Sequence, residues 1–122
     1  MKAGTQFELS SNSEILKINS PKKNIGGPYA VVYKNTESRW VLSVLTWDNK
    51  PHLGIRWFWG SSGMPTSRGH STWHVIPAEL ATSILNGLPL DSNFRSKIDE
   101  FLSGKIDGKV ISHWYKSKTD LS

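Results

Sequence analysis

The chain has 122 residues, the size of one domain, and it contains no cysteine, which excludes disulfides and thiolate metal sites. Its 15 Lys and Arg against 10 Asp and Glu give a formal charge of +5, which favours polyanionic partners although charge alone is weak evidence. Residues 1–13 lack the apolar run of a secretion signal, and no later stretch is apolar for long enough to cross a membrane. We expect one cytoplasmic domain over residues 1–122 that makes no membrane contact, with a core at about 14–115 and polar ends at 1–13 and 116–122.

The first half of the chain predicts strands separated by loop-forming residues. Residues 14–18 and 29–34 are candidate strands, and the Pro-, Gly- and Lys-rich stretch 19–28 between them predicts an exposed basic loop. After a turn at 35–38, residues 39–47 are apolar at both alternating sets of positions, as in a strand at the centre of a sheet.

A hairpin and two further strands are expected next. Asp48 and Asn49 tolerate turn dihedral angles, and the strand 52–59 follows Pro51. Residues 60–69 predict a flexible connection before a strand at 70–76. Alternation places the apolar set of 52–59 in the core and leaves the other set on a polar face. The core set is Leu53, Ile55, Trp57 and Trp59, and the other set is His52, Gly54, Arg56 and Phe58.

Helix signals dominate the rest of the chain. Pro77 and Glu79 suit a first helical turn, and the apolar stripe that follows ends near Gly87. A second helix is expected from Asp91 or Ser92 to Gly104, and a last strand at 110–115. The predicted class is therefore α+β, with an antiparallel sheet of four or five strands followed by one or two packed helices.

No convincing catalytic set is present, and we expect neither enzymatic activity nor a metal or other cofactor. Ser61 or Ser62 with His70 or His74 could be imagined as a nucleophile and base, but the surrounding stretch 49–78 holds no carboxylate to orient them. His70 and His74 could also share a strand face and a metal with His52, yet histidines on a polar sheet face are much commoner than such a ligand trio.

The acid-free stretch between Asp48 and Glu79 interleaves basic and aromatic residues. Surfaces that stack bases and neutralise phosphates have this composition. A sheet core with a polar outer face is the alternative interpretation.

A family resemblance adds to this composition. Residues 44–51 (VLTWDNKP) and 53–59 (LGIRWFW) look like the central hairpin of the transcriptional coactivator family called positive cofactor four. The order of a basic loop, another strand and a Pro-initiated helix continues the match, over about residues 29–88. The resemblance implies a curved antiparallel sheet backed by a helix, homodimerisation, and single-stranded DNA gripped along the sheet.

Carried over by position, the resemblance assigns phosphate contacts to Lys50 and Arg68, and phosphate contact or stacking to Arg56. It makes Trp47 and Phe58 base platforms and His70 and His74 secondary contacts, while Trp57, Trp59 and Trp73 would be core. The sequence departs from the family in its lysine-poor loop at 60–69 and in the extra segments at both ends.

The leading prediction is therefore a non-enzymatic, homodimeric protein that binds single-stranded nucleic acid, with DNA rather than RNA implied by the resemblance. Arg56 could instead pair with a neighbour, and Phe58 or Trp47 could be buried against a helix or a dimer partner. The alternative function is a module whose tryptophan-rich cleft binds a small molecule or a protein partner. An enzyme ranks third.

Overall fold

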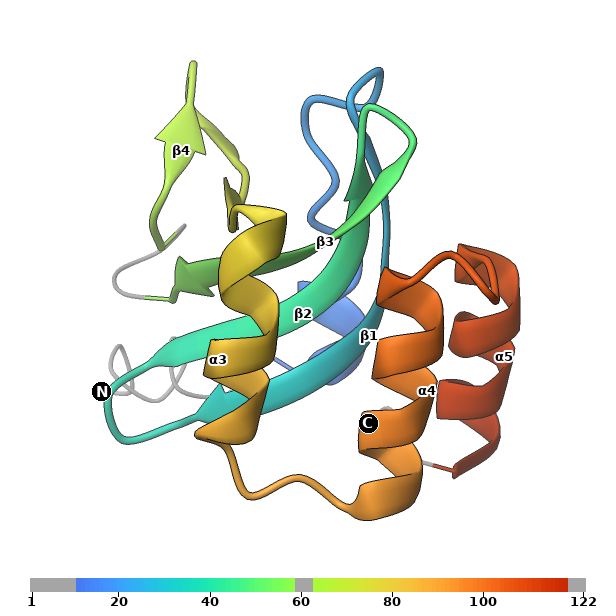
Figure 1. Ribbon diagram of the computed structural model, residues 1–122. Coiled ribbons are helices and arrows are strands. Elements are labelled where there is room, and N and C mark those ends of the chain that lie inside the picture. Colours follow the sequence, from blue (N-terminus) through green and yellow to red (C-terminus); the bar gives the residue numbers. More distant parts are fainter. Residues whose placement is uncertain (1–10, 59–62, 119–122) are drawn as a thin grey trace.

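A computed structural model describes residues 11–58 and 63–118 as an antiparallel sheet with helices packed on it (Figure 1). The larger sheet has the strand order β1-β2-β3-β6, and β4 and β5 form a separate hairpin. The α+β class is thus confirmed. No helix of the described residues is long and apolar enough to span a membrane. In chain order the elements are α2 (Asn12–Ile15), β1 (Ile25–Asn35), β2 (Trp40–Trp47), β3 (Lys50–Trp57), β4 (Thr66–Ser67), β5 (His70–Ser71), β6 (His74–Val75), the 3-10 helix η1 (Ala78–Leu80), α3 (Ala81–Asn86), α4 (Ser92–Leu102) and α5 (Gly108–Lys118).

The strand β2 lies at the centre of the sheet, as its sequence predicts. It pairs with β1 on one side and with β3 on the other. Residues 41–45 are all buried, so that both faces of the sheet are covered. The core is therefore built in two layers, one on each side of β2.

Two hairpins end in tight turns of the same kind. Asp48 and Asn49 between β2 and β3 have φ angles of 51° and 69°, and Arg68 and Gly69 between β4 and β5 have φ angles of 53° and 81°. Two consecutive positive φ angles are typical of the type I′ turn, whose twist matches that of the strands. The hairpin expected at Asp48 and Asn49 is confirmed.

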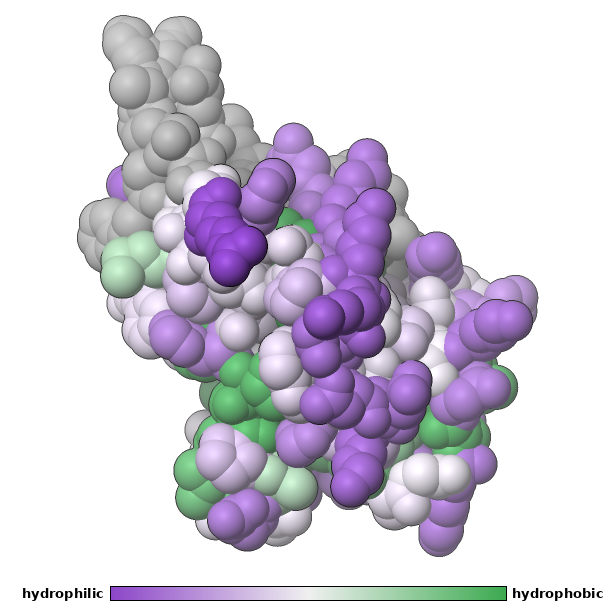
Figure 2. Space-filling view, turned by 90° about the horizontal axis from the view of Figure 1, so that it is seen from above, coloured by the Kyte–Doolittle hydropathy of each residue, from purple (hydrophilic) through white to green (hydrophobic). Residues whose placement is uncertain are grey.

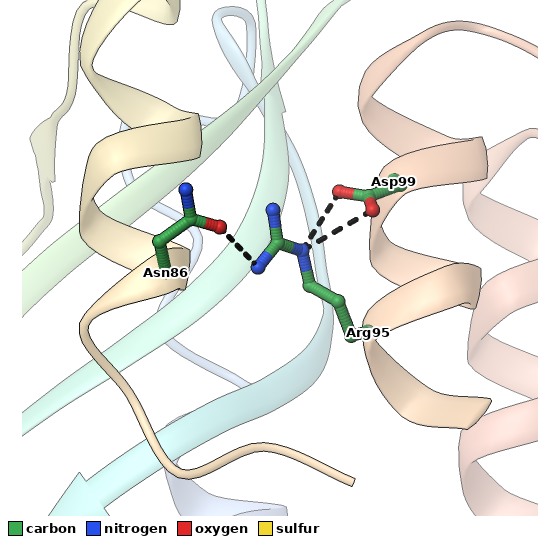
Figure 3. Close-up of polar contacts among 3 residues, drawn as sticks. All are labelled: Asn86, Arg95 and Asp99. Carbon is green, nitrogen blue, oxygen red and sulfur yellow. Dashed lines mark hydrogen bonds and ion pairs between the residues drawn. The ribbon is translucent and has the colours of Figure 1, made fainter. Parts of the chain in front are cut away.

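The helices α3 and α4 cover one face of the sheet, with α3 in front of β2 in Figure 1, and α5 lies beside α4 and packs against β1. The Asp91 carboxylate caps α4 by accepting hydrogen bonds from the backbone N–H groups of Asn93 and Phe94, at 3.0 and 3.1 Å. Figure 3 shows Arg95 of α4 between Asn86 at the end of α3 and Asp99, to which it donates hydrogen bonds of 2.9 and 3.0 Å. Both expected helices are confirmed.

The opposite face is covered by the segment 11–24 and by the loop 63–73. The indole N–H of Trp73 donates to the Ile18 carbonyl at 2.7 Å, and the Thr72 hydroxyl donates to the Ser20 carbonyl at 2.6 Å. These bonds fasten the two covering segments to each other. They hold residues 11–24 over the face of the sheet that strand alternation alone predicts to be exposed.

Three predicted strands are wrong. Residues 14–18 begin inside α2, because Ser11 and Glu14 form a capping box that starts a helix. Residues 110–115 belong to α5, whose first turn is capped by the Asp107 side chain accepting from the Val110 N–H at 3.0 Å, and this helix extends to Lys118 in the expected polar tail. Residues 70–76 form the short strands β5 and β6 of two different sheets, rather than one strand.

Candidate nucleic-acid interface

The sheet face that carries Arg56 and Phe58 is not an open surface. Both side chains do share a face, since a single residue lies between them and side chains alternate along the strand, but Arg56 is only 2% exposed and Phe58 6%. The loop 63–73 covers Arg56, and Lys34 of β1 lies over the Phe58 ring. The expectation that these two residues contact bases or phosphates is therefore corrected: neither reaches the surface of this fold.

Arg56 instead holds the loop 63–73 against the sheet. Its guanidinium donates hydrogen bonds to the carbonyl of Thr72 and, at 3.2 Å, to that of Pro65. Burial lowers the pKa of Arg56 to about 10, which still leaves the group charged at neutral pH. Phe58 lies below the ammonium of Lys34, whose Nζ is 5.8 Å from the ring centroid. Burial lowers the pKa of Lys34 too, and Glu14 opposes this shift.

Three loops lie at the upper end of the molecule in Figure 1, the β4–β5 hairpin on the left and the other two further right, and we call the area they form the three-loop surface. It consists of residues 17–24, the turn 48–50 and the hairpin tip 68–70. The first two are joined because the Asp48 N–H donates to the Asn24 carbonyl at 2.8 Å and the Asn24 amide donates to the Asp48 carboxylate at 2.6 Å. The hairpin is joined to 17–24 by the bond from Thr72 to Ser20.

The three-loop surface holds most of the net positive charge of the chain. Five cationic residues and one acidic residue, Asp48, give it +4 of the total formal charge of +5, and all six side chains are exposed. Figure 2 views this end from above and shows hydrophilic residues gathered in a band across it. The five cationic residues are Lys17, Lys22, Lys23, Lys50 and Arg68.

A hollow of about 510 Å³ opens in the three-loop surface between the segment 17–22 and the β5 strand. Lys17, Lys22 and His70 line it. On another side of the same end, half-buried Trp47 pairs across the hairpin with Lys50 and, in the other direction, with Ile25. An aromatic ring and cations thus occur together here, which is the combination that a single strand requires.

The predicted site residues divide into two groups. Lys50, Arg68 and His70 belong to the three-loop surface and Trp47 directly precedes its turn 48–50, whereas Arg56 and Phe58 are buried and His74 lies elsewhere. His74 is exposed on β6 opposite Ile55, and its neighbours Trp73 and Val75 turn to the other face. Sequence reasoning did not assign Lys17, Lys22 and Lys23 to the site, although the basic composition of 19–28 was a usable signal.

The three tryptophans that were expected in the core differ in their burial. Trp73 is buried as expected, Trp57 is half-buried, and Trp59 lies outside the described residues. The hollow of the three-loop surface contains no tryptophan in its lining, so the proposed tryptophan-rich cleft does not coincide with it. Within residues 11–58 and 63–118, no three His, Asp or Glu side chains lie close enough together to hold a metal ion.

Comparison with known proteins identifies no relative. No model of a protein family, no curated protein and no solved structure matches the chain. The likeness to positive cofactor four therefore depends on the residues quoted above alone. What the protein does has to be argued from the three-loop surface itself.

Proposed function

We propose that this protein binds single-stranded nucleic acid, without catalysing a reaction, through the three-loop surface. The observation that carries the proposal is the concentration of +4 of a total formal charge of +5 on 14 residues of three adjoining loops. Lys and Arg side chains that neutralise phosphates release counterions, and this release supplies most of the sequence-independent affinity for nucleic acid.

Trp47 supports a single strand rather than a duplex as the partner. Its indole is half-buried and lies next to Lys50 at the hairpin, so a base could stack on it while a phosphate meets the ammonium group. Bases inside a duplex stack on each other and do not offer their faces in this way. The family resemblance adds the proposals of DNA as the strand, of a homodimer, and, with the cysteine-free composition, of a cytoplasmic location.

The test is a titration of labelled oligonucleotides followed by fluorescence anisotropy at low and moderate salt. The ligands are a single-stranded DNA, the same sequence as RNA, and the DNA duplex. The proteins are the wild type, the double variant Lys22→Gln with Lys50→Gln, and the control Lys97→Gln, whose lysine lies on α4 and pairs with Glu100 at 3.4 Å. Sedimentation of the same samples gives the oligomeric state.

The wild type should bind single-stranded DNA more tightly than duplex, with an affinity that falls as salt rises. The double variant should bind about 10-fold more weakly at low salt, because each lost phosphate contact costs affinity, and the control should match the wild type. Absence of wild-type binding at low salt would overturn the proposal. An equal loss of affinity in the control would also overturn it, because the surface would then not be specific.

A further inference from the structure

We infer that the bound strand continues beyond the three-loop surface, along a basic path that passes between α2 and α5 and then follows α5. This inference rests on the proposed function. Three hollows form the path, and each shares a lining residue with the next. The first is the hollow of the three-loop surface, the second shares Lys17 with it, and the third shares Ser112 and Lys116 with the second.

The packing of α5 explains why the hollows are neighbours. The Asn12 side-chain amide of α2 donates to the Tyr115 hydroxyl of α5 at 3.2 Å, so the two helices lie side by side. Lys109, Ser112 and Lys116 are spaced by three and four residues, which places them on one face of α5. That face flanks Pro28 and Tyr29 at the start of β1.

The chemistry of the path is that of a phosphate track. Lys17, Lys109 and Lys116 supply charge, and the hydroxyls of Ser13 and Ser112 supply hydrogen-bond donors. No Asp or Glu is among the residues that line the three hollows. A chain of hollows with cations and no carboxylates suits an extended polyanion better than a compact ligand, because charge is distributed along its length.

Oligonucleotides of two lengths distinguish a test of this inference from a test of the proposed function. A strand of about 5 nucleotides should be held by the three-loop surface, and one of about 20 nucleotides should also occupy the path, given that comparable binding surfaces cover about 4 to 16 nucleotides. The variant is Lys109→Gln with Lys116→Gln. The control, Lys97→Gln with Lys118→Gln, removes the same charge, and its Lys118 lies about half a turn around α5 from Lys109.

Loss of the two path lysines should weaken binding of the long strand about 10-fold at low salt and should reduce the slope of log affinity against log salt by about 1.4, at about 0.7 per phosphate. Binding of the short strand should not change, and the control should behave as the wild type with both strands. Unchanged binding of the long strand, or an equal loss in the control, would overturn the inference. Failure of the proposed function would look different, because the wild type would then bind neither strand.

Discussion

Arg56 shows how a side chain chosen as a ligand contact can have a structural role. An exposed arginine on a sheet face can meet a phosphate, but this one is 2% exposed and donates to two carbonyls of the loop 63–73. Its burial has an energetic cost, which the lowered pKa reflects, and the hydrogen bonds offset part of that cost. The residue therefore stabilises the loop that supports the hairpin tip of the three-loop surface.

Replacement of Arg56 by Met tests this role. Met keeps most of the buried volume but leaves the carbonyls of Pro65 and Thr72 without the guanidinium donor. We expect the free energy of unfolding to fall by about 1–3 kcal/mol, the usual cost of an unsatisfied buried acceptor. The Thr72 carbonyl loses its donor, whereas the Pro65 carbonyl keeps the backbone N–H of Thr72 at 3.0 Å. Urea denaturation followed by tryptophan fluorescence measures it. A variant as stable as the wild type with weakened oligonucleotide binding would instead return Arg56 to the binding site.

For single residues, the sequence predicts which side chains share a face of a strand but not whether that face is exposed to solvent. Arg56 and Phe58 do lie on one face, and Leu53 is buried on the other, as the period of two requires. The Arg56 face is covered by the loop 63–73, which Arg56 contacts, and by the distant residues 11–24, which the bonds of Trp73 and Thr72 fasten to that loop. Period-two patterns contain no information about such long-range contacts, so the sequence could not exclude the covered face from the site.

Among the secondary-structure elements, the sequence correctly predicted a turn and a helix start that depend on residues close together in the chain. Asp48 with Asn49 predicted the β2–β3 turn, and Asp91 predicted the start of α4, because each relies on a neighbouring backbone group. The two helices mistaken for strands also begin with caps, formed by Ser11 with Glu14 and by Asp107. The strand predictions for 14–18 and 110–115 relied on short runs of apolar and aromatic residues and did not use these caps, although such runs do not distinguish the two structures.

The packing of α5 on β1 gives a prediction for Gly108, the first residue of α5. A Cβ at Gly108 would overlap the Tyr29 ring, which the Phe101 ring restrains at a centroid distance of 5.7 Å. Overpacking of this kind costs about 1–3 kcal/mol and exceeds the helix-propensity gain of at most about 1 kcal/mol. We therefore expect Gly108→Ala to lower the thermal midpoint.

The matched control is Gly87→Ala at the end of α3. Gly87 has a φ of −87°, and a Cβ there would come no closer than 3.5 Å to its nearest atom, the Ile84 carbonyl oxygen. Restriction of the unfolded chain should leave this variant as stable as the wild type or more stable by up to about 1 kcal/mol. Calorimetry of both variants separates the two effects. Equal midpoints would show that α5 can move away from Tyr29.

At the scale of the whole molecule, the fold brings three separate segments of the sequence together. Their 14 residues carry a net charge of +4 in one area of the surface. Sequence reasoning located the basic stretch after Asp48, but the lysines of 17–24 join it only through contacts between distant loops, such as the bonds between Asn24 and Asp48. Like charges held together repel one another and lower stability, so such a cluster is expected where binding requires it.

This repulsion can be measured with the double variant Lys22→Gln with Lys50→Gln. Removal of two cations from the three-loop surface should raise the free energy of unfolding by a few tenths of a kcal/mol at low salt, because the repulsion is relieved, while it weakens binding. The gain should shrink as NaCl rises from about 0.05 to about 0.5 M, where the screening length falls below about 5 Å. Lys97→Gln should shift stability in the opposite direction, since it removes the attraction between Lys97 and Glu100.

Urea denaturation at the two salt concentrations measures the stability of the wild type and of both variants. A double variant less stable than the wild type at low salt would show that the lysines stabilise the loops themselves, and the charge cluster would then need no bound strand to explain it.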